Sequence, residues 1–419
     1  MAPLPNDAES SGPAEAFRRQ WSQPADVFSV LLLLGGEVVH RALGQLAGGK
    51  MATVTFSFGW ASYAIMMLLA SIGDAKLMPV VPSDSCLVVN VKSGYVRSNV
   101  SCVIDRLVRD YDSWMDEAIK ERLNQMLDDR MRYMQQKVRK GTNIPRPGQT
   151  GLCVGVYEPS QVLGCGEPVR DLIFWSGPLV SLVQLALALI PLVTDGDWFV
   201  LLITLCGTFL ALATGSLPAW AAEKWACRRG TYSSFVLTKG NGFQHAILIL
   251  GNGRGLNLED LAVASRLYQG PSDIMTRASL AVLATLWVLL LVSAAGVANG
   301  AIYLLAIGGL GMFHCIVVVG SRRKPGALGV HLEYRGVVGD MTVMGSLLQC
   351  EERYSGVGKA LLPIFFPGKL LPEEVAQWAA LEESKRIAKE AEQDSGTAGE
   401  ESRVVESWTA HARSHQVTP

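Results

Sequence analysis

The chain has 419 residues, of which 49% are hydrophobic and only 18% are charged, whereas an average soluble domain carries about 25% charged residues. Its 37 lysines and arginines nearly balance its 38 aspartates and glutamates, so the formal net charge is -1. This balance excludes a nucleic-acid binder that relies on excess positive charge. Eight cysteines without any C-x-x-C spacing exclude a disulfide-dense scaffold and a zinc or redox site of that type.

The N-terminal part of the chain changes from polar to apolar. Residues 1–25 lack the apolar core of a signal peptide, so we expect a disordered segment that is not cleaved as a leader. Residues 26–73 hold the first two candidate membrane helices. Segment 51–73 contains no Asp, Glu, Lys or Arg and is long enough to cross about 30 Å of hydrocarbon. It is predicted to span the membrane.

The other candidate helix, 27–49, carries Glu37, His40 and Arg41 after its apolar half. A charged residue at the centre of a span costs about 2.5–3.5 kcal/mol, so this helix either spans the membrane or lies in the interface. The three side chains share one helix face because they stand at i, i+3 and i+4. An ionisable residue inside a membrane is a functional candidate. The structural alternative is a Glu37/Arg41 ion pair near the interface.

Residues 74–171 form the first long loop. Residues 86–97 show the β-favouring pattern of a hairpin around a glycine turn. Residues 104–138 then carry apolar side chains at spacings of three and four, which predicts one amphipathic helix of about 35 residues. This helix either packs on the rest of the loop, binds a protein partner as a coiled coil, or lies on the bilayer surface.

The same loop contains evidence on its compartment. Asn99 begins an N-glycosylation sequon, and four cysteines accompany it, namely Cys86, Cys102, Cys153 and Cys165. In an oxidising lumen, Asn99 is predicted to carry a glycan and the four thiols to form two disulfides. The distribution of lysine and arginine points to the cytosol instead, and we favour that side.

Two apolar regions, 172–218 and 278–320, are each long enough for a helical hairpin. They predict four membrane helices: 172–193, 198–218, 278–298 and 301–320. The turns at 194–197 and 299–300 contain no lysine or arginine, whereas cations such as Arg170, Arg277 and Arg322 flank the opposite helix ends. By the positive-inside rule these two turns face away from the cytosol. With 27–49 as a sixth span, both ends of the chain and the long loops are cytosolic.

The second long loop, 219–277, is predicted to hold two strands, 234–239 and 244–250, followed by a glycine-rich turn and a helix start at Asn257. Gly251, Gly253 and Gly255 resemble a phosphate-binding turn, but their spacing is not that of a dinucleotide fingerprint. Two acidic residues also follow where a phosphate would lie. A β-hairpin that is followed by a tight glycine turn explains the same residues. We therefore predict no cofactor and keep the glycines as candidates only.

The remaining chain is predicted to be a C-terminal α+β lobe over 321–393 and a disordered tail over 394–419. Nowhere does the sequence show a metal-binding histidine cluster, a nucleophile elbow or a carboxylate pair within a span. We therefore predict no catalytic residue and no metal ligand. Besides Glu37, His40 and Arg41, the polar candidate within the spans is His314, which either serves transport or forms hydrogen bonds between helices.

Several stretches resemble a group of uncharacterised multi-span integral membrane proteins of filamentous fungi. They include QWSQPADVFSVLLLLGGEVVHRALGQLAG, FSFGWASYA with GDAKLMP, FVLTKGNGFQHAILILGNGRGLNLEDLA and ALLPIFFPGKL. This resemblance implies a fungal source and a membrane location, and it transfers no catalytic residue and no substrate. Some fungal membrane proteins accompany specialised-metabolite pathways, so the resemblance also points toward such a pathway.

The sequence therefore predicts an α-helical polytopic membrane protein with five or six transmembrane helices and α+β extramembrane lobes. We expect it to lie in the plasma membrane or an endomembrane, in contact with the lipid bilayer and with a protein partner of the 104–138 helix. The leading hypothesis is an accessory, scaffold or sensor protein rather than an enzyme. The alternatives are a small-molecule or ion transporter that uses the Glu37/His40/Arg41 face and a nucleotide-regulated membrane enzyme.

Overall fold

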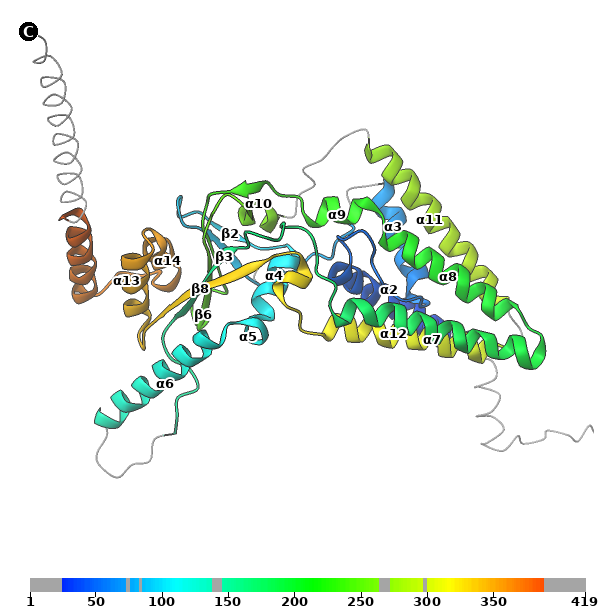
Figure 1. Cartoon of the computed structure of the whole chain (residues 1–419), viewed down its shortest axis with the longest axis horizontal. Coiled ribbons are helices and arrows are strands. Elements are labelled where there is room, and N and C mark those ends of the chain that lie inside the picture. The colour runs from blue at the N-terminus through cyan, green and yellow to red at the C-terminus, as the bar shows by residue number, and fades with distance from the viewer. Residues whose placement is uncertain are drawn as a thin grey trace, which may run out of the picture. The chain divides into compact units, whose positions relative to one another are not determined.

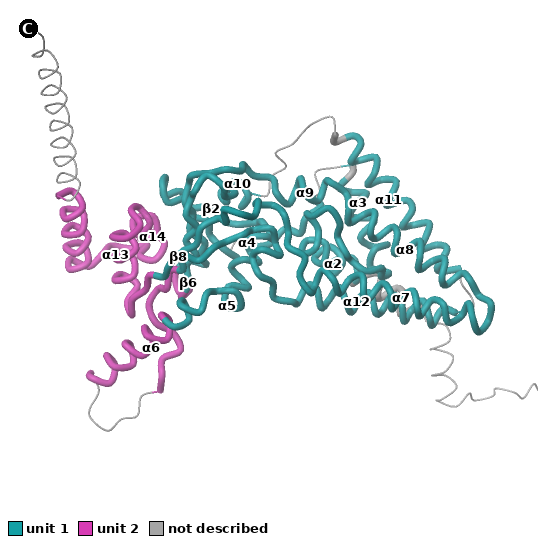
Figure 2. The backbone as a smooth tube through the Cα atoms, in the orientation of Figure 1, with its two compact units in different colours: residues 1–121, 155–240, 245–337 teal, residues 122–154, 241–244, 338–419 magenta. Residues whose placement is uncertain are grey.

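A computed structural model describes residues 25–72, 76–82, 85–137, 145–263, 272–296 and 300–387. The predicted disordered tail 394–419 lies outside these residues, as does 1–25 except for its last residue. The chain divides into two compact units (Figure 2). Unit 1 comprises Met1–Glu121, Gly155–Gly240 and His245–Val337, and unit 2 comprises Arg122–Val154, Asn241–Gln244 and Val338–Pro419.

The four long apolar helices that the sequence predicts are present in unit 1 (Figure 1). They are α7 (Leu172–Asp195), α8 (Phe199–Gly215), α11 (Ser272–Ala295) and α12 (Ala301–Gly320). A short helix, α9 (Pro218–Lys224), continues α8. Within the described residues, four helices are thus long and apolar enough to cross a membrane, and large apolar side chains such as Leu182, Phe209 and Val292 are exposed on them. This is the pattern of a polytopic helical membrane protein, as predicted.

The predicted 51–73 span is wrong. Helix α2 (Ala25–Leu46) covers most of the 27–49 segment, but α3 (Gly59–Ile72) has only 14 residues. At 1.5 Å per residue α3 is about 21 Å long, which is too short for a bilayer crossing. Residues 51–57 have no regular secondary structure, and residues 52–58 are buried. Their alternating Thr53-Val-Thr-Phe-Ser-Phe58 pattern is typical of a strand rather than of a helix.

Residues 51–58 run in extended form between the long helices. A Cβ atom built on Gly215 of α8 would lie 2.9 Å from Ala52, and one built on Gly207 would lie 2.4 Å from the ring of Phe56. Eight residues of α8 cover about 12 Å, and the four residues from 52 to 56 cover the same distance only with an extended backbone. The segment therefore descends alongside α8 into the bundle.

Helix α3 then runs in the same direction as α2 and packs beside it. Gly59 packs against Gly35, because a Cβ on either glycine would lie less than 3 Å from the other's backbone. Further along both helices, the rings of His40 and Tyr63 have centroids 5.5 Å apart. The two helices thus run parallel, and residues 51–72 enter the bundle and turn back. We call residues 51–72 the re-entrant segment.

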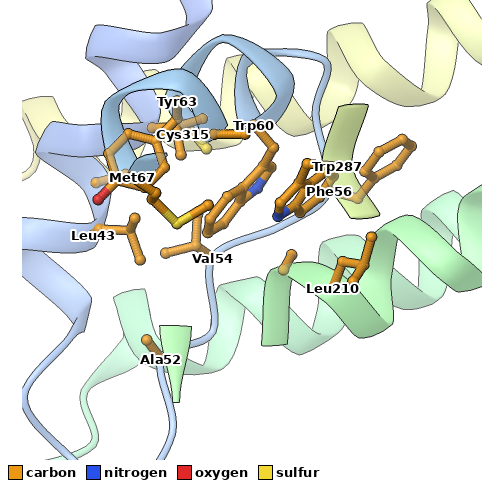
Figure 3. Packing of buried hydrophobic residues seen from close by; sticks show 14 of the residues in the cluster. Leu43, Ala52, Val54, Phe56, Trp60, Tyr63, Met67, Leu210, Trp287 and Cys315 are labelled. Carbon is orange, nitrogen blue, oxygen red and sulfur yellow. The ribbon is translucent and has the colours of Figure 1, made fainter. Parts of the chain in front are cut away.

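The core of the bundle forms around this segment (Figure 3). The rings of Trp60 and Trp287 stack with centroids 5.2 Å apart, and Phe56 stacks on Trp287 at 6.2 Å. Backbone carbonyls of the segment accept side-chain hydrogen bonds, from Trp60 Nε1 to Thr55 O at 2.9 Å and from Gln184 Nε2 to Phe56 O at 2.8 Å. Such bonds are needed because a non-helical backbone at membrane depth has no water to bind.

The three regions predicted to be extramembrane contribute strands to one sheet. Its six strands are β1 (Leu87–Asn90), β2 (Val96–Ser98), β3 (Cys153–Pro159), β5 (Phe235–Thr238), β6 (His245–Ile249) and β8 (Leu332–Gly339), in the order β2-β1-β5-β6-β3-β8. The predicted hairpins are confirmed, because β1 pairs with β2 and β5 with β6 in antiparallel fashion. A second sheet pairs β4 (Arg229–Thr231) with β7 (Gly255–Leu256). Short helices α10 (Leu258–Val263) and η1 (Pro325–Leu328) accompany them.

The single helix predicted over 104–138 is also wrong, since three helices replace it. They are α4 (Cys102–Arg109), α5 (Tyr111–Trp114) and α6 (Glu117–Lys137), and Val138 lies outside the described residues. The helix is interrupted at Asp110, whose carboxylate pairs with Arg106, and again at Met115, whose backbone is extended with ψ 147°. The Asp116 carboxylate then accepts a hydrogen bond from the Ala118 N–H and starts α6.

In unit 2, α13 (Val343–Arg353) and α14 (Val357–Phe365) precede a helical stretch over 372–387. Glu351 organises this group, because its carboxylate accepts hydrogen bonds from the N–H groups of Gly356 and Lys359 at the start of α14 and from Lys385 Nζ. Burial raises the pKa of Glu351, but these hydrogen bonds outweigh burial, so its pKa lies below the ordinary value. The predicted helices of the 321–393 lobe are thus present.

Candidate functional site

The Glu37/His40/Arg41 face predicted from the sequence lines a cleft of about 480 Å³ in unit 1. Its walls come from α2, from the segment 76–82 that follows α3, and from α4. The cleft therefore lies where the membrane bundle meets the sheet-bearing part, and we call it the junction cleft. Its charged and polar lining residues are Glu37, His40, Arg41, Gln45, Lys76, Asp105, Arg106 and Arg109.

The α2 face contributes one ion pair and one anchoring histidine. Arg41 Nε donates to Glu37 Oε1 at 2.7 Å, and both side chains are more than half exposed. The predicted pair therefore exists, and at such exposure it stabilises the fold by only about 0.3–0.5 kcal/mol. His40 is buried, and its Nε2 lies 2.9 Å from Leu77 O. This contact fixes the 76–82 segment beside α2 and so shapes one wall of the cleft.

The floor of the cleft is a buried arginine. Arg106 Nη1 donates to Val319 O at 3.0 Å, and Nη2 donates to Ser321 O and lies 3.2 Å from Asp110 Oδ2. A cation at these carbonyls satisfies the last turn of α12 and complements its dipole. Arg106 Nε has no hydrogen-bond partner within the described residues, although the side chain is buried. The same is true of Gln45 Oε1, which also lines the cleft.

Two further buried cations fix helix ends next to the cleft. Arg323 forms two hydrogen bonds of 2.8 Å with Asp171, and its Nη1 donates to Gln45 O at 2.7 Å. Asp171 in turn caps α7 through the Phe174 N–H. Burial opposes ionisation of Asp171, but the bonds from Arg323 outweigh it, so the pKa of Asp171 is lowered. Lys224 Nζ binds the α2 carbonyl Gly44 O and the adjoining Ala47 O.

His314, the remaining polar candidate, does not line the junction cleft. Its Nδ1 lies 3.1 Å from Thr55 Oγ1, and its Nε2 lies 2.9 Å from Ser176 Oγ. The imidazole therefore links α12 both to the re-entrant segment and to α7. This geometry favours the structural interpretation of His314 over a role in transport.

The glycine turn does not have the geometry of a phosphate site. The Gly251 N–H donates to Ser234 Oγ, and the Gly253 N–H donates to Thr231 O. A Cβ on Gly253 would lie 2.6 Å from the Tyr232 ring, and the positive φ of 79° requires glycine there. A Cβ on Gly255 would meet Pro159 at 2.9 Å. These glycines serve close packing.

The helix that follows the turn is closed to an anion as well. Asn257 Oδ1 accepts hydrogen bonds from the N–H groups of Glu259 and Asp260, which confirms Asn257 as the N-cap. Arg228 holds Asp260 through two hydrogen bonds, of 2.6 and 3.0 Å. The first N–H groups of α10 are thus occupied by its own cap. The geometry does not favour the nucleotide hypothesis.

The signals for a lumenal loop are not supported. Asn99 is fully buried, its Nδ2 donates to Ser101 O, and its Oδ1 accepts from the Ser101 N–H. A glycan on that nitrogen would displace the surrounding core. All eight cysteines lie in the described residues, and all are free thiols, including the four that would form disulfides if the loop were lumenal. Burial raises the pKa of Cys86 and Cys153 to about 12 and that of Cys102 to about 11, and it also raises the pKa of Cys165.

Sequence reasoning found the α2 face but missed the side chains opposite it, Lys76, Asp105, Arg106 and Arg109. The signal was the pair of adjacent charges at 105 and 106 on a helix whose other positions, apart from the terminal Arg109, are apolar, which is unusual for a simple solvated face. Within the described residues there is no group of three or more His, Cys, Asp or Glu side chains that could hold a metal ion. No protein family, curated protein or solved structure matches this chain.

Proposed function

We propose that this protein is an accessory or sensor protein of the membrane that binds a ligand in the junction cleft and carries out no covalent chemistry. The observation that carries the proposal is the composition of the cleft wall. One side is α2, and the other is α4, which contacts α10, and α10 in turn packs with β1 and β2 of the six-stranded sheet. A ligand that contacts both α2 and α4 would therefore influence the position of the extramembrane part relative to the bundle.

Arg106 supplies the physical link between cleft and fold. It lines the cleft, and it also holds the end of α12 through Val319 O and Ser321 O. A ligand that changes the arginine's contacts changes those of α12 as well. Within unit 1, cleft occupancy and helix position are coupled in this way, which is what a sensor requires.

We infer that the chain crosses the membrane five times, through α2, α7, α8, α11 and α12. The re-entrant segment then adds no crossing, because it leaves on the side where it enters. Cations flank the helix ends next to the sheet, and acidic residues occupy the α7–α8 turn. By the positive-inside rule the sheet is cytosolic. The N-terminal end of α2 then faces the opposite compartment, unlike the six-span arrangement.

Hydrogen–deuterium exchange of the full chain in detergent tests the proposal. The delipidated protein is compared with and without a total lipid extract and, separately, an aqueous metabolite extract of the expression host. One extract should slow exchange in peptides covering 76–82 and 102–109. Val80→Trp, which places a large ring at an exposed cleft position, should remove the effect, whereas Tyr95→Trp on the hairpin should not. Equal exchange under all conditions would contradict a ligand-binding role.

Transport is the second candidate, and the re-entrant segment is the observation that favours it, because non-helical backbone at membrane depth often lines a substrate path. The cavity beside this segment, between Phe56 and Leu290, has a volume of only about 10 Å³, room for about one water. A Glu37→Gln, Arg41→Leu double variant that reaches the membrane but abolishes a solute flux in proteoliposomes would establish transport. Unchanged flux would remove the α2 face from any transport path.

A further inference from the structure

We propose that the junction cleft holds the headgroup of an anionic glycerophospholipid that enters from the surrounding leaflet. This inference rests on the proposed function, since it names the chemical class of the ligand in that same cleft. It follows from three independent properties: two unsatisfied polar atoms, the charge of the lining, and the apolar helix surface at its mouth.

The two unsatisfied atoms define what the ligand must supply. Arg106 Nε is a buried donor without an acceptor in the described part of the chain, and Gln45 Oε1 is a buried acceptor without a donor there. A buried polar group left unpaired has lost its hydrogen bonds to water without replacement, so native proteins pair such groups. A phosphate oxygen would satisfy the guanidinium, and a hydroxyl or ammonium group on the same ligand would satisfy the amide.

The charge of the lining selects an anion. Four cations line the cleft, Arg41, Lys76, Arg106 and Arg109, against the two carboxylates of Glu37 and Asp105. A third carboxylate, that of Asp110, lies outside the lining and pairs with Arg106 and Arg109, so one positive charge remains in excess. Arg41 is committed to Glu37, but Lys76 has no ion-pair partner among the described residues. Arg109 lies 3.7 Å from Asp110 and is half exposed. Lys76 is therefore free to turn toward a bound phosphate, whereas Arg109 would exchange its long contact with Asp110 for one with the phosphate.

The mouth of the cleft adjoins a surface suited to acyl chains. Met66 lines the cleft, and it belongs to a row of exposed apolar side chains on α3 that also includes Ile65, Leu69 and Ile72. Glu37 lies nine residues before the end of α2, about 13 Å along the helix axis. Polar cleft and apolar row thus lie at the depth where a phospholipid changes from headgroup to tails. A soluble anion would occupy the polar cleft and leave the apolar row on α3 uncovered.

The volume agrees with this occupant, because about 480 Å³ lies within the range of about 300–1,000 Å³ that is usual for ligand pockets. The headgroup of phosphatidylserine carries a phosphate for Arg106, an ammonium group for Gln45 and a net negative charge for Lys76 and Arg109. It is therefore the probe that the cleft should retain. Phosphatidylcholine has no N–H or O–H donor and no net charge.

The test uses the full chain, purified in neutral detergent and delipidated. Native mass spectrometry counts retained lipid, and thermal unfolding measures stabilisation, with phosphatidylserine, phosphatidylcholine or glycerol 3-phosphate as the probe. We expect one phosphatidylserine per chain, at least tenfold tighter than phosphatidylcholine, and no binding of glycerol 3-phosphate at the same concentration. Lys76→Gln with Arg109→Gln should weaken phosphatidylserine at least tenfold. The matched control, Lys92→Gln with Arg132→Gln, removes two exposed cations outside the cleft and should change nothing.

A second variant avoids disturbing α12. Gln45→Met keeps the side-chain volume and removes the amide, including its unpaired acceptor. The lipid-free protein should therefore fold, and phosphatidylserine should bind it less tightly than it binds wild type. Equal retention of both lipids would overturn the anionic assignment while leaving a ligand-binding cleft. If glycerol 3-phosphate bound as tightly as the lipid, this would overturn the claim that the ligand enters from the membrane. Absence of any binding would overturn the inference, and the exchange experiment on Val80→Trp would decide separately whether the proposed function survives.

Discussion

Replacing Gly311 by alanine should destabilise the membrane bundle, because this glycine lets the re-entrant segment pass α12. A Cβ at position 311 would lie 1.8 Å from Phe56 O and 2.8 Å from Gln184 Nε2. Backbone must therefore shift, and the 2.8 Å hydrogen bond between those two groups is lost. Overpacking costs about 1–3 kcal/mol, and a hydrogen bond contributes about 1 kcal/mol. Gly311→Ala should therefore lower the free energy of unfolding by about 2–4 kcal/mol.

The same helix offers a control two residues away. A Cβ at Gly309 would meet nothing within 4 Å, so Gly309→Ala should be neutral or slightly stabilising, since alanine favours helix by up to about 1 kcal/mol. Unfolding in SDS of the protein in mixed micelles, followed by the fluorescence of the stacked Trp60 and Trp287, measures both variants. Each 1.4 kcal/mol changes the folding equilibrium constant tenfold, so this constant should be lower by about 30-fold or more in the Gly311 variant than in wild type. Equal stability of the two variants would refute the packing of the extended segment 51–58 against α12.

Three further predictions concern the extramembrane region. Because Asn99 is fully buried, glycosidase treatment should not change gel mobility, and wild type and Asn99→Gln should migrate alike; a shift specific to wild type would place the sheet in the lumen. The pKa of Asp171 is lowered from 3.8, so its pairing with Arg323 stabilises the fold above that pH and is lost as the pH falls through the lowered value. The stability difference between wild type and Asp171→Asn should thus stay constant from pH 8 to 5 and shrink below about 4; a difference that grows on acidification would reverse the sign. Since the pKa of Cys86 and Cys153 is raised from 9.0 to about 12, their thiolate fraction at neutral pH falls about 1,000-fold, and maleimide should label them only after denaturation. Rapid labelling of the native protein would contradict the burial.

The four long helices could be predicted because lipid allows no unpaired charge over about 20 residues, and this constraint is local in sequence. The re-entrant segment could not, although its Thr53-Val-Thr-Phe-Ser-Phe58 alternation is visible. Averaged hydropathy treats it as part of a span. The features that allow an extended backbone inside the bundle are Gly177, Gly207 and Gly311 and the amide of Gln184, all more than 100 residues away.

The candidate site was half predictable for a similar reason. Charges on an apolar helix stand out, so Glu37, His40 and Arg41 were found. The role of Arg106 was not predictable, because the adjacent charges at 105 and 106 mark an unusual position but do not show what the arginine binds. Its burial depends on the carbonyls of Val319 and Ser321, which only folding brings to it.

The order of synthesis adds a consequence of the inserted segment. Thr55 leaves the ribosome 256 residues before its partner Gly311, which at about 5–20 residues per second is a delay of about 13–50 s. During that time the strand-like stretch has neither helix nor neighbours to occupy its peptide groups, and lipid supplies none. The nascent chain must therefore wait at the translocon or under a membrane chaperone until the last apolar hairpin arrives. Chains truncated before α12 should accordingly be recognised and degraded as unassembled.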